Sequence, residues 1–279
     1  MIPYTVIDKS YLQGAGRLDI HKLCKAGAIM SDTLFAELVT STAEECRRCF
    51  GKFPIGPNPI NMIPSVGFLM HYEIENRAPC TPLIDRQPYA RFEFHAGLAA
   101  GTYDFGNKEI VQAVQDITRE TGERVACFRE ASSVLESWFP ELKRFPPNGP
   151  RPLIDAAMNS VASDRDRVRE IYRAILRGMQ ALFDEGFSPP MPNFSSLNPA
   201  EIDESWIWFR TLQAQLLAAL EFVRKNGVGS LGQQSESVEH DLLDAEYVAL
   251  GTLSGALASR DKTLQRFFQL VCPQGILIS

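Results

Sequence analysis

The sequence has no long apolar run, no basic leader and little cysteine. No stretch approaches the roughly 18–20 apolar residues that span a bilayer. The first residues, Met1 to Tyr4, lack the basic region and following apolar region of a secretory signal. Six cysteines in 279 residues are too few for a disulfide scaffold. These absences predict a cytoplasmic protein whose cysteines are thiols.

An excess of positive charge is also missing. The chain carries 28 basic and 34 acidic residues, so its formal net charge is −6. This balance argues against a surface that binds nucleic acid over most of its area, but it leaves room for a small basic rim. Internal repeats and low-complexity tracts are absent. The hydrophobic fraction of 45% predicts an ordinary globular protein with a sizeable core.

Strands and helices are expected to alternate at both ends of the chain. Short apolar runs indicate strands, and apolar residues at a spacing of three to four indicate helices. The expected elements are a strand at 4–8, a helix near 19–25, a strand at 28–31, a helix at 33–49, a helix at 239–254, a strand at 256–259, a helix at 263–271 and a strand at 275–279. This alternation favours an α/β fold with a parallel sheet flanked by helices, built from residues 1–50 and 200–279.

The middle of the chain, residues 51–199, is predicted to be a large, mostly helical insertion or subdomain. Seven of the 18 prolines lie between Gly51 and Pro88, which indicates an irregular connection with short helical pieces. Two long helical patterns follow, at 107–142 and 152–185. A strong amphipathic helix is expected at 200–225, where Trp206 and Trp208 lie on different faces, so that one of them is open to exposure.

Acidic residues stand where the apolar runs end and where helices begin. Asp8 and Asp261 each follow an apolar run, and Glu37 lies one turn into the helix after the second strand. Asp241 and Asp244 are three residues apart in the first turn of the helix at 239–254. Ligands of open parallel sheets bind beyond the carboxyl ends of the strands. If the two termini meet in space, these acids converge at such an edge.

Converging carboxylates predict a metal site. Clustered acids cost free energy unless a cation sits among them. Oxygen ligands suit Mg²⁺ or Mn²⁺. A pair of such ions can activate water and stabilise the leaving oxygen of a phosphodiester. The pattern therefore predicts metal-dependent phosphodiester chemistry.

The order of motifs at the two ends resembles that of the PIN-like (PilT N-terminus) metal-dependent nuclease domains. The first motif is a strand that ends in an aspartate, Val6-Ile7-Asp8. The second is a helix start in which a serine precedes a glutamate by six residues, Ser31-Asp32-Thr33-Leu34-Phe35-Ala36-Glu37. An acid-led helix from Asp244, a short strand and the tail Ser259-Arg260-Asp261 complete the likeness. It covers the ends of the chain and not its middle.

This resemblance implies a nuclease, and most often a ribonuclease; some members are toxins of toxin–antitoxin pairs. The implied catalytic acids are Asp8, Glu37, Asp244 and Asp261, which would bind Mg²⁺ or Mn²⁺ with Asp241 as a further metal ligand. The residues expected to contact substrate are Ser10, Arg260 and Lys262. RNA is expected as the partner ahead of DNA, and no membrane is expected. A protein regulator or antitoxin and a homodimer stay open.

Structural explanations compete with this interpretation. Asp8 and Asp261 could simply cap a loop and a helix, and acids such as Asp244 are favoured near a helix N-terminus by its dipole. Two other functions stay open. The fold could be a non-catalytic PIN-like scaffold whose helical insertion binds proteins, or it could be a structure-specific DNA nuclease.

Two further patterns are expected to be structural. Cys46 and Cys49 form a CxxC motif, but a zinc site would need a second pair at similar spacing. They are expected to be two thiols on one turn of a helix. An aromatic group could stack nucleic-acid bases, but it is expected to belong to the core; its members are Tyr72, Tyr89, Phe92 and Phe94.

Overall fold

The computed structural model describes most of the chain and divides it into two compact units. The described residues are 4–132, 135–184, 200–228 and 235–279. Unit 1 consists of Met1–Leu69, Thr81–Gly122 and Leu250–Ser279, and unit 2 consists of Met70–Cys80 and Glu123–Ala249. These units and the predicted core and insertion divide the chain at different residues. No helix among the described residues is long and apolar enough to cross a membrane.

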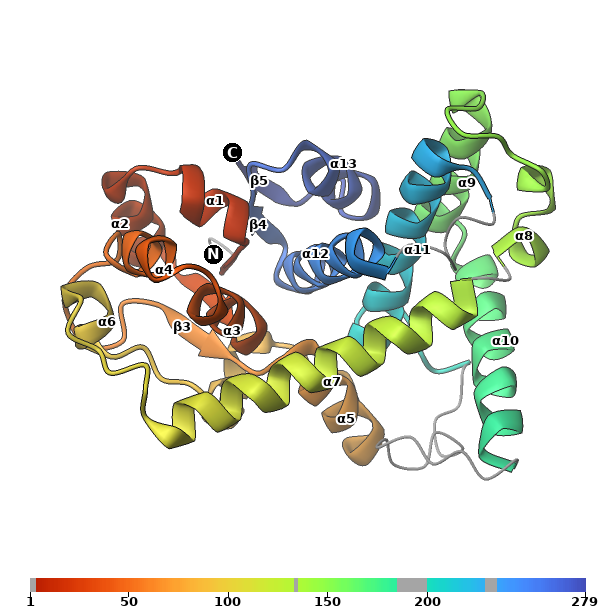
Figure 1. The fold of residues 1–279 in the computed structure, drawn as a ribbon. Coiled ribbons are helices and arrows are strands. Elements are labelled where there is room, and N and C mark those ends of the chain that lie inside the picture. Colours follow the sequence, from red (N-terminus) through yellow and green to blue (C-terminus); the bar gives the residue numbers. More distant parts are fainter. Residues whose placement is uncertain (1–3, 133–134, 185–199, 229–234) are drawn as a thin grey trace. The chain divides into compact units, whose positions relative to one another are not determined.

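Unit 1 contains a parallel sheet of five strands in the order β3-β2-β1-β4-β5. The strands are β1 (Thr5–Ile7), β2 (Ala28–Ser31), β3 (Asn61–Ile63), β4 (Ala256–Ala258) and β5 (Ile276–Ile278). Every residue of β1, β2 and β4 is buried, which is why these strands are continuous apolar runs in the sequence. In Figure 1 the red N-terminal segment and the blue C-terminal segment meet where β1 pairs with β4. The predicted α/β fold with a parallel sheet is confirmed.

Helices flank this sheet. Those of unit 1 are α1 (Lys9–Gly14), α2 (Arg17–Ala26), α3 (Asp32–Thr40), α4 (Ala43–Phe50), α6 (Ala96–Ala100), α13 (Lys262–Val271) and the 3₁₀ helix η1 (Leu83–Tyr89). Three helices have residues in both units: α5 (Val66–Asn76), α7 (Lys108–Ser132) and α12 (Ser235–Ser254). Several of these helices begin directly after a strand. Their first residues therefore lie at the carboxyl edge of the sheet.

Two predictions for unit 1 were wrong in detail. The predicted helix at 33–49 is two helices, because α3 ends at Thr40 and Thr42 starts α4 by accepting a hydrogen bond from Glu45 N at 3.2 Å. The proline-dense segment also contains β3, which pairs with β2. A strand of three residues between prolines is too short to show a period in the sequence.

The aromatic residues of unit 1 form much of its core. Phe92 and Phe94 are buried as predicted, and the Phe92 ring stacks on Phe35 with 4.2 Å between centroids. Tyr89 differs, because it is exposed. Cys46 and Cys49 are buried free thiols on α4, which confirms the prediction of two thiols on one helical turn.

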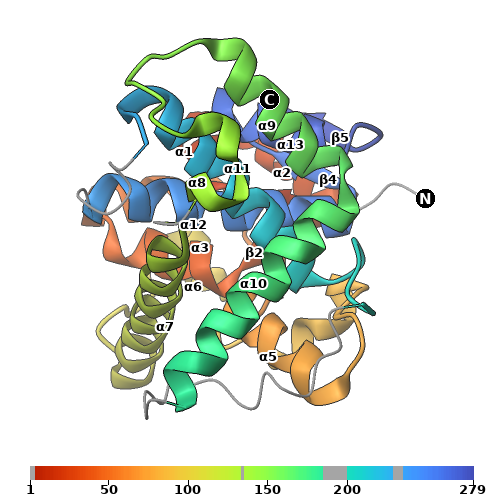
Figure 2. The ribbon, with the colours of Figure 1, turned by 90° about the vertical axis from the view of Figure 1, so that its right-hand side faces the viewer.

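Unit 2 is helical in its described part. Its further elements are α8 (Leu135–Trp138), η2 (Pro140–Leu142), α9 (Arg151–Ser163), α10 (Arg165–Asp184) and α11 (Ile207–Asn226). The predicted helix at 152–185 is interrupted at Asp164, which ends α9 and accepts a hydrogen bond from Arg167 N at 3.0 Å at the start of α10. Figure 2 shows α9 and α10 in green, and both pack against α11.

The helix α11 is buried on nearly all sides rather than on one stripe. Trp206 and Trp208 are both buried, which corrects the expectation that one of them is open to exposure. The indole nitrogen of Trp208 donates to the carbonyl of Met70 at 2.9 Å, so the polar end of this side chain is satisfied. Hydrophobic positions read from one helix face could not show that neighbours cover the opposite face as well.

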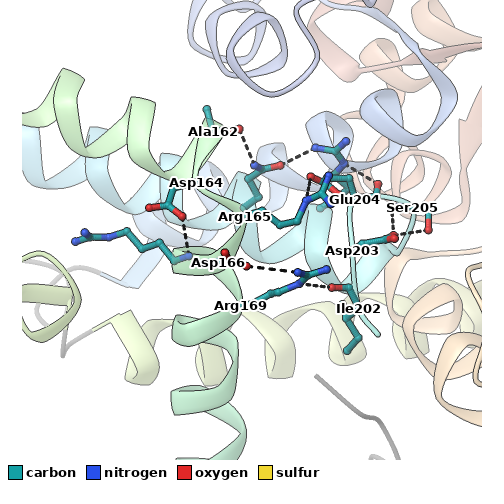
Figure 3. Close-up of polar contacts among 12 residues, drawn as sticks. Ala162, Asp164, Arg165, Asp166, Arg169, Ile202, Asp203, Glu204 and Ser205 are labelled. Atoms are coloured by element: carbon teal, nitrogen blue, oxygen red, sulfur yellow. Dashed lines mark hydrogen bonds and ion pairs between the residues drawn. The ribbon is translucent and has the colours of Figure 1, made fainter. Parts of the chain in front are cut away.

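A polar network holds residues 202–205 to the start of α10 (Figure 3). The guanidinium of Arg165 binds Glu204 at 2.5 Å, and Arg169 donates to the carbonyl of Ile202 at 2.9 Å. Burial acts to raise the pKa of Asp203, but hydrogen bonds from Ser205 and the charges of Arg165 and Arg169 lower it overall. These charged groups bind other segments of the chain. We therefore assign the network a structural role and not a ligand-binding role.

Candidate functional site

The candidate site lies at the carboxyl ends of β1 and β4. Strands β2 and β3 continue the sheet on one side of β1, whereas β4 and β5 continue it on the other. The strand order therefore reverses between β1 and β4, where open α/β sheets bind their ligands. The register pairs Ile7 with Ala258, so the next residues along the two strands are Asp8 and Ser259. Asp8 N donates to Ala258 O at 3.1 Å and extends the pairing to this edge.

Asp8 is buried and its carboxylate is held by three donors. Its Oδ1 atom accepts a hydrogen bond from Tyr11 N at 2.7 Å, which caps α1. Its Oδ2 atom accepts from the Ser259 hydroxyl at 2.6 Å, and the Ser10 hydroxyl lies 2.9 Å from both oxygens. Burial raises the pKa of Asp8, these three hydrogen bonds oppose the rise, and the negative charge of Asp261 adds to it.

Asp261 is joined to Asp8 through the same two serines. Its backbone nitrogen donates to Ser10 Oγ at 3.0 Å and to Ser259 Oγ at 3.1 Å. Its Oδ1 atom caps α13 by accepting from Thr263 N at 2.6 Å and from Leu264 N at 3.1 Å. Within the described part of the chain, no hydrogen bond reaches its Oδ2 atom. The structure thus brings together Asp8 and Asp261, two of the five predicted acids.

Glu37 belongs to the same unit as this pair. It is half-buried in the second turn of α3, which begins at Asp32 directly after β2. Because β2 pairs with β1 in parallel, α3 begins at the same sheet edge as Asp8. A metal-binding role for Glu37 stays a prediction.

Asp241 and Asp244 lie on α12, in residues that belong to unit 2, and both are half-buried. Among the residues that the structure describes, no group of three or more histidine, cysteine, aspartate or glutamate residues is arranged to hold a metal ion. Metal binding by Asp241 and Asp244 therefore stays a prediction.

The residues predicted to contact substrate differ in how they are used. The Ser10 hydroxyl donates to Asp8 and accepts from Arg260 N at 2.9 Å and Asp261 N at 3.0 Å, which fills its hydrogen-bonding capacity. Arg260 and Lys262 are exposed. The Lys262 ammonium donates to Gln265 Oε1 at 3.2 Å. Ser10 thus positions the two acids, whereas the cations are accessible.

The predictions did not include Ser259 or Asp32 at this edge. Ser259 follows β4 just as Asp8 follows β1, and this matching position after a strand was the available signal. Asp32 is buried, and its carboxylate accepts from Arg91 N at 2.8 Å and from Phe92 N at 3.3 Å. Burial raises the pKa of Asp32 to about 7. Asp32 therefore anchors a distant loop to the carboxyl end of β2.

No family model matches this chain, and comparisons with curated proteins and with solved structures find no similar protein. The Asp8 and Asp261 pair is the part of this edge whose geometry bears on function. Its chemistry is that of two carboxylates and two hydroxyl groups at a strand-order reversal.

Proposed function

We propose that this chain is a metal-dependent phosphodiesterase, and specifically a PIN-like endoribonuclease. The observation that carries the proposal is the convergence of Asp8 and Asp261 at the edge between β1 and β4. These residues come from opposite ends of the chain, yet both bind the same two serine hydroxyls. A like charge beside a buried carboxylate is unfavourable, and a bound cation would relieve it.

The donor atoms at this edge fit Mg²⁺ or Mn²⁺. All of them are oxygens, which these ions prefer over nitrogen or sulfur. Asp8 and Asp261 would hold the ion. Glu37, Asp241 and Asp244 stay predicted ligands. Such an ion, when bound, supplies activated water and stabilises the leaving oxygen of a phosphodiester. The free Oδ2 atom of Asp261 is the acceptor that remains after the hydrogen bonds within the described residues are counted.

The protein's own contribution is to orient these acids. Ser10 and Ser259 fix the Asp8 carboxylate and hold the backbone of Asp261 beside it. Their hydrogen bonds also favour the ionised form of Asp8 against the effect of burial. A carboxylate that is already held in place loses little freedom when it binds a cation.

Asparagine substitutions separate a metal role from a structural role. Asparagine caps helices about as well as aspartate, so Asp8→Asn and Asp261→Asn keep the caps of α1 and α13 while removing one charge each. We expect cleavage of labelled RNA with Mn²⁺ or Mg²⁺ by the wild type, at least about 100-fold less in either variant, and none with EDTA. Single-stranded and duplex DNA complete the substrate panel.

The matched control is Asp19→Asn, which removes the same charge from an exposed residue of α2. It should retain wild-type cleavage. Equal activity of Asp8→Asn and wild type would refute the proposal. Cleavage confined to DNA would assign the site to a DNA nuclease.

A non-catalytic scaffold is the second candidate. The observation that favours it is that Asp8 and Asp261 both cap helices, which gives each acid a structural purpose. In that case no substrate of the panel is cut, and Asp8→Asn leaves the protein's other properties unchanged. The helical insertion would then carry the function through protein partners.

A further inference from the structure

The Arg260 side chain lies directly against the backbone of Gly14. Gly14 is the last residue of α1, and a Cβ atom placed on it would lie 2.6 Å from Arg260 Cδ and 2.9 Å from Arg260 Nη1. Real Cβ atoms essentially never make such short contacts. Gly14 has no positive φ, so its backbone conformation does not require glycine. A side chain at residue 14 would instead make the flexible end of the Arg260 side chain move.

Further cations surround the same end of α1. The Lys52 ammonium donates to Gln13 O at 2.9 Å and also to Leu12 O, which satisfies carbonyls at the helix C-terminus. Burial is the main reason that the pKa of Lys52 is lowered, and the charges of Arg48 and Arg260 lower it further. Because Lys52 binds Gln13 O and Arg260 lies against Gly14, the two cations meet at the same end of α1.

Lys9 belongs to the same cluster. Burial raises the pKa of Cys49, whereas the charges of Lys52, Arg48 and Lys9 oppose that rise. Lys9 begins α1, Arg48 lies in the last turn of α4, and these two helices are in contact. We call Lys9, Arg48, Lys52 and Arg260 the basic cluster. Among the described residues, no acid forms an ion pair with Lys9, Arg48 or Arg260. Glu45 is nearby, but it accepts a hydrogen bond from Gln13.

Like charges repel one another, so a basic cluster without paired acids is less favourable until an anion binds to it. Arginine recognises phosphate through two parallel hydrogen bonds. The cluster adjoins the candidate site directly, because Arg260 N donates to Ser10 and the next residue is Asp261. A phosphate bound by the Arg260 side chain would lie near the C-terminal end of α1, one short helix away from Asp8, which caps the N-terminal end of α1.

We infer that the basic cluster binds the backbone phosphates of a single-stranded nucleic acid, and that Gly14 leaves the room in which the Arg260 side chain lies. The inference rests on the proposed function, which supplies the strand that enters the acid site. The net charge of −6 limits phosphate binding elsewhere on the surface.

Binding without cleavage tests this inference. Fluorescence anisotropy in EDTA would measure the affinity of the wild type for a labelled 12-nucleotide RNA and for the DNA of the same sequence. We expect Arg48→Ala to weaken binding about fivefold and to lower the salt dependence by about one released ion. Gly14→Ala keeps every charge and moves only the flexible end of Arg260, so it should weaken binding less than Arg48→Ala does.

Lys25→Ala is the matched control, because Lys25 is an exposed cation in the last turn of α2, just before the amino end of β2. Its affinity should equal that of the wild type, and melting curves would show that all variants fold. Alanine also favours a helix over glycine, so Gly14→Ala should not unfold the protein. Unchanged affinity in Arg48→Ala and Gly14→Ala would overturn the inference, as would an equal loss in Lys25→Ala.

This design separates the inference from the proposed function. RNA binding in EDTA that is weakened by the cluster substitutions, together with no cleavage in Mn²⁺, would support phosphate binding by the basic cluster. The same result would refute the proposed nuclease activity. If Asp8→Asn abolished cleavage but Arg48→Ala bound RNA as tightly as the wild type, the nuclease activity would be supported. The inference that the basic cluster binds phosphates would then be overturned. Binding of both RNA and DNA supports recognition through phosphate, whereas binding of RNA alone adds contact with the sugar hydroxyl.

Discussion

The charge of Asp8 depends on two serine hydroxyls. Burial disfavours its ionised form, and Ser259 and Ser10 offset part of that cost by donating hydrogen bonds. The folded-state pKa is above its ordinary value, so Asp8 contributes stability at low pH that is lost as the pH rises through this pKa. Removing a donor must raise the pKa further and enlarge that loss.

Ser259→Ala should therefore destabilise the protein in a pH-dependent manner. We expect a free energy of unfolding about 1–2 kcal/mol lower at pH 8 and a smaller loss at pH 4, where Asp8 needs less support for a charge. Urea unfolding from pH 4 to 8 measures this difference. Ser163→Ala, at an exposed position of α9, is the control and should show no such trend. A loss that is constant with pH would contradict the explanation.

At the scale of elements, α11 takes its N-terminal cap from a distant part of the chain. Trp206 at the cap position provides no side-chain hydrogen bond. Glu73 of α5 instead accepts from Ile207 N at 2.8 Å and Trp208 N at 3.3 Å, and also from Cys80 N at 2.9 Å. Glu73 is 0% exposed, and burial raises its pKa to about 7 against these hydrogen bonds. Its charge thus changes near neutral pH.

This cap predicts a pH-dependent stability of unit 2. The folded pKa of Glu73 is raised above the unfolded value of 4.5, so its contribution is full below pH 4.5 and is lost as the pH rises through about 7. In Glu73→Gln this titration is absent. Between pH 5 and pH 8, we expect the free energy of unfolding of the wild type to fall by about 1–3 kcal/mol more than that of Glu73→Gln.

Chemical unfolding at several pH values measures that difference. Glu170→Gln, at an exposed glutamate of α10, is the matched control and should keep the wild-type slope. Burial also raises the pKa of Asp32 to about 7. Part of the change of the free energy of unfolding with pH should therefore remain in Glu73→Gln. If the free energy of unfolding changed with pH equally in Glu73→Gln and in the wild type, Glu73 would not titrate in this range.

At the scale of the whole molecule, the candidate site joins the two ends of the chain. Asp8 follows the first strand and Asp261 follows the fourth, and folding alone brings them together. An ion that binds both acids would therefore bind the folded chain and not the unfolded one. Such binding stabilises the native state by mass action.

We accordingly expect Mn²⁺ to raise the melting temperature of the wild type by several degrees. A ligand at about 100 times its dissociation constant contributes about 2.7 kcal/mol, so the shift should be easily measured. Asp8→Asn and Asp261→Asn should lose it, whereas Asp19→Asn should keep it. A shift that is the same in all four proteins would indicate ions bound to surface acids in general.

The elements at the ends of the chain were largely predictable from the sequence. Short apolar runs such as Ala28–Ser31 are buried on both faces, so their composition alone marks them as strands. The breaks at Ser41 and Asp164 and the strand β3 were missed. A helix pattern continues across a single capping residue, and a three-residue strand has no readable period.

The sequence by itself determined the α/β class and the placement of acids after strands, because burial and capping act on neighbouring residues. Only the tertiary structure decided which acids meet. The pairing of β1 with β4 joins Asp8, Ser259 and Asp261 through contacts between opposite ends of the chain. It also placed Arg260 against Gly14. Such contacts depend on strand order and register, which local periodicity does not encode.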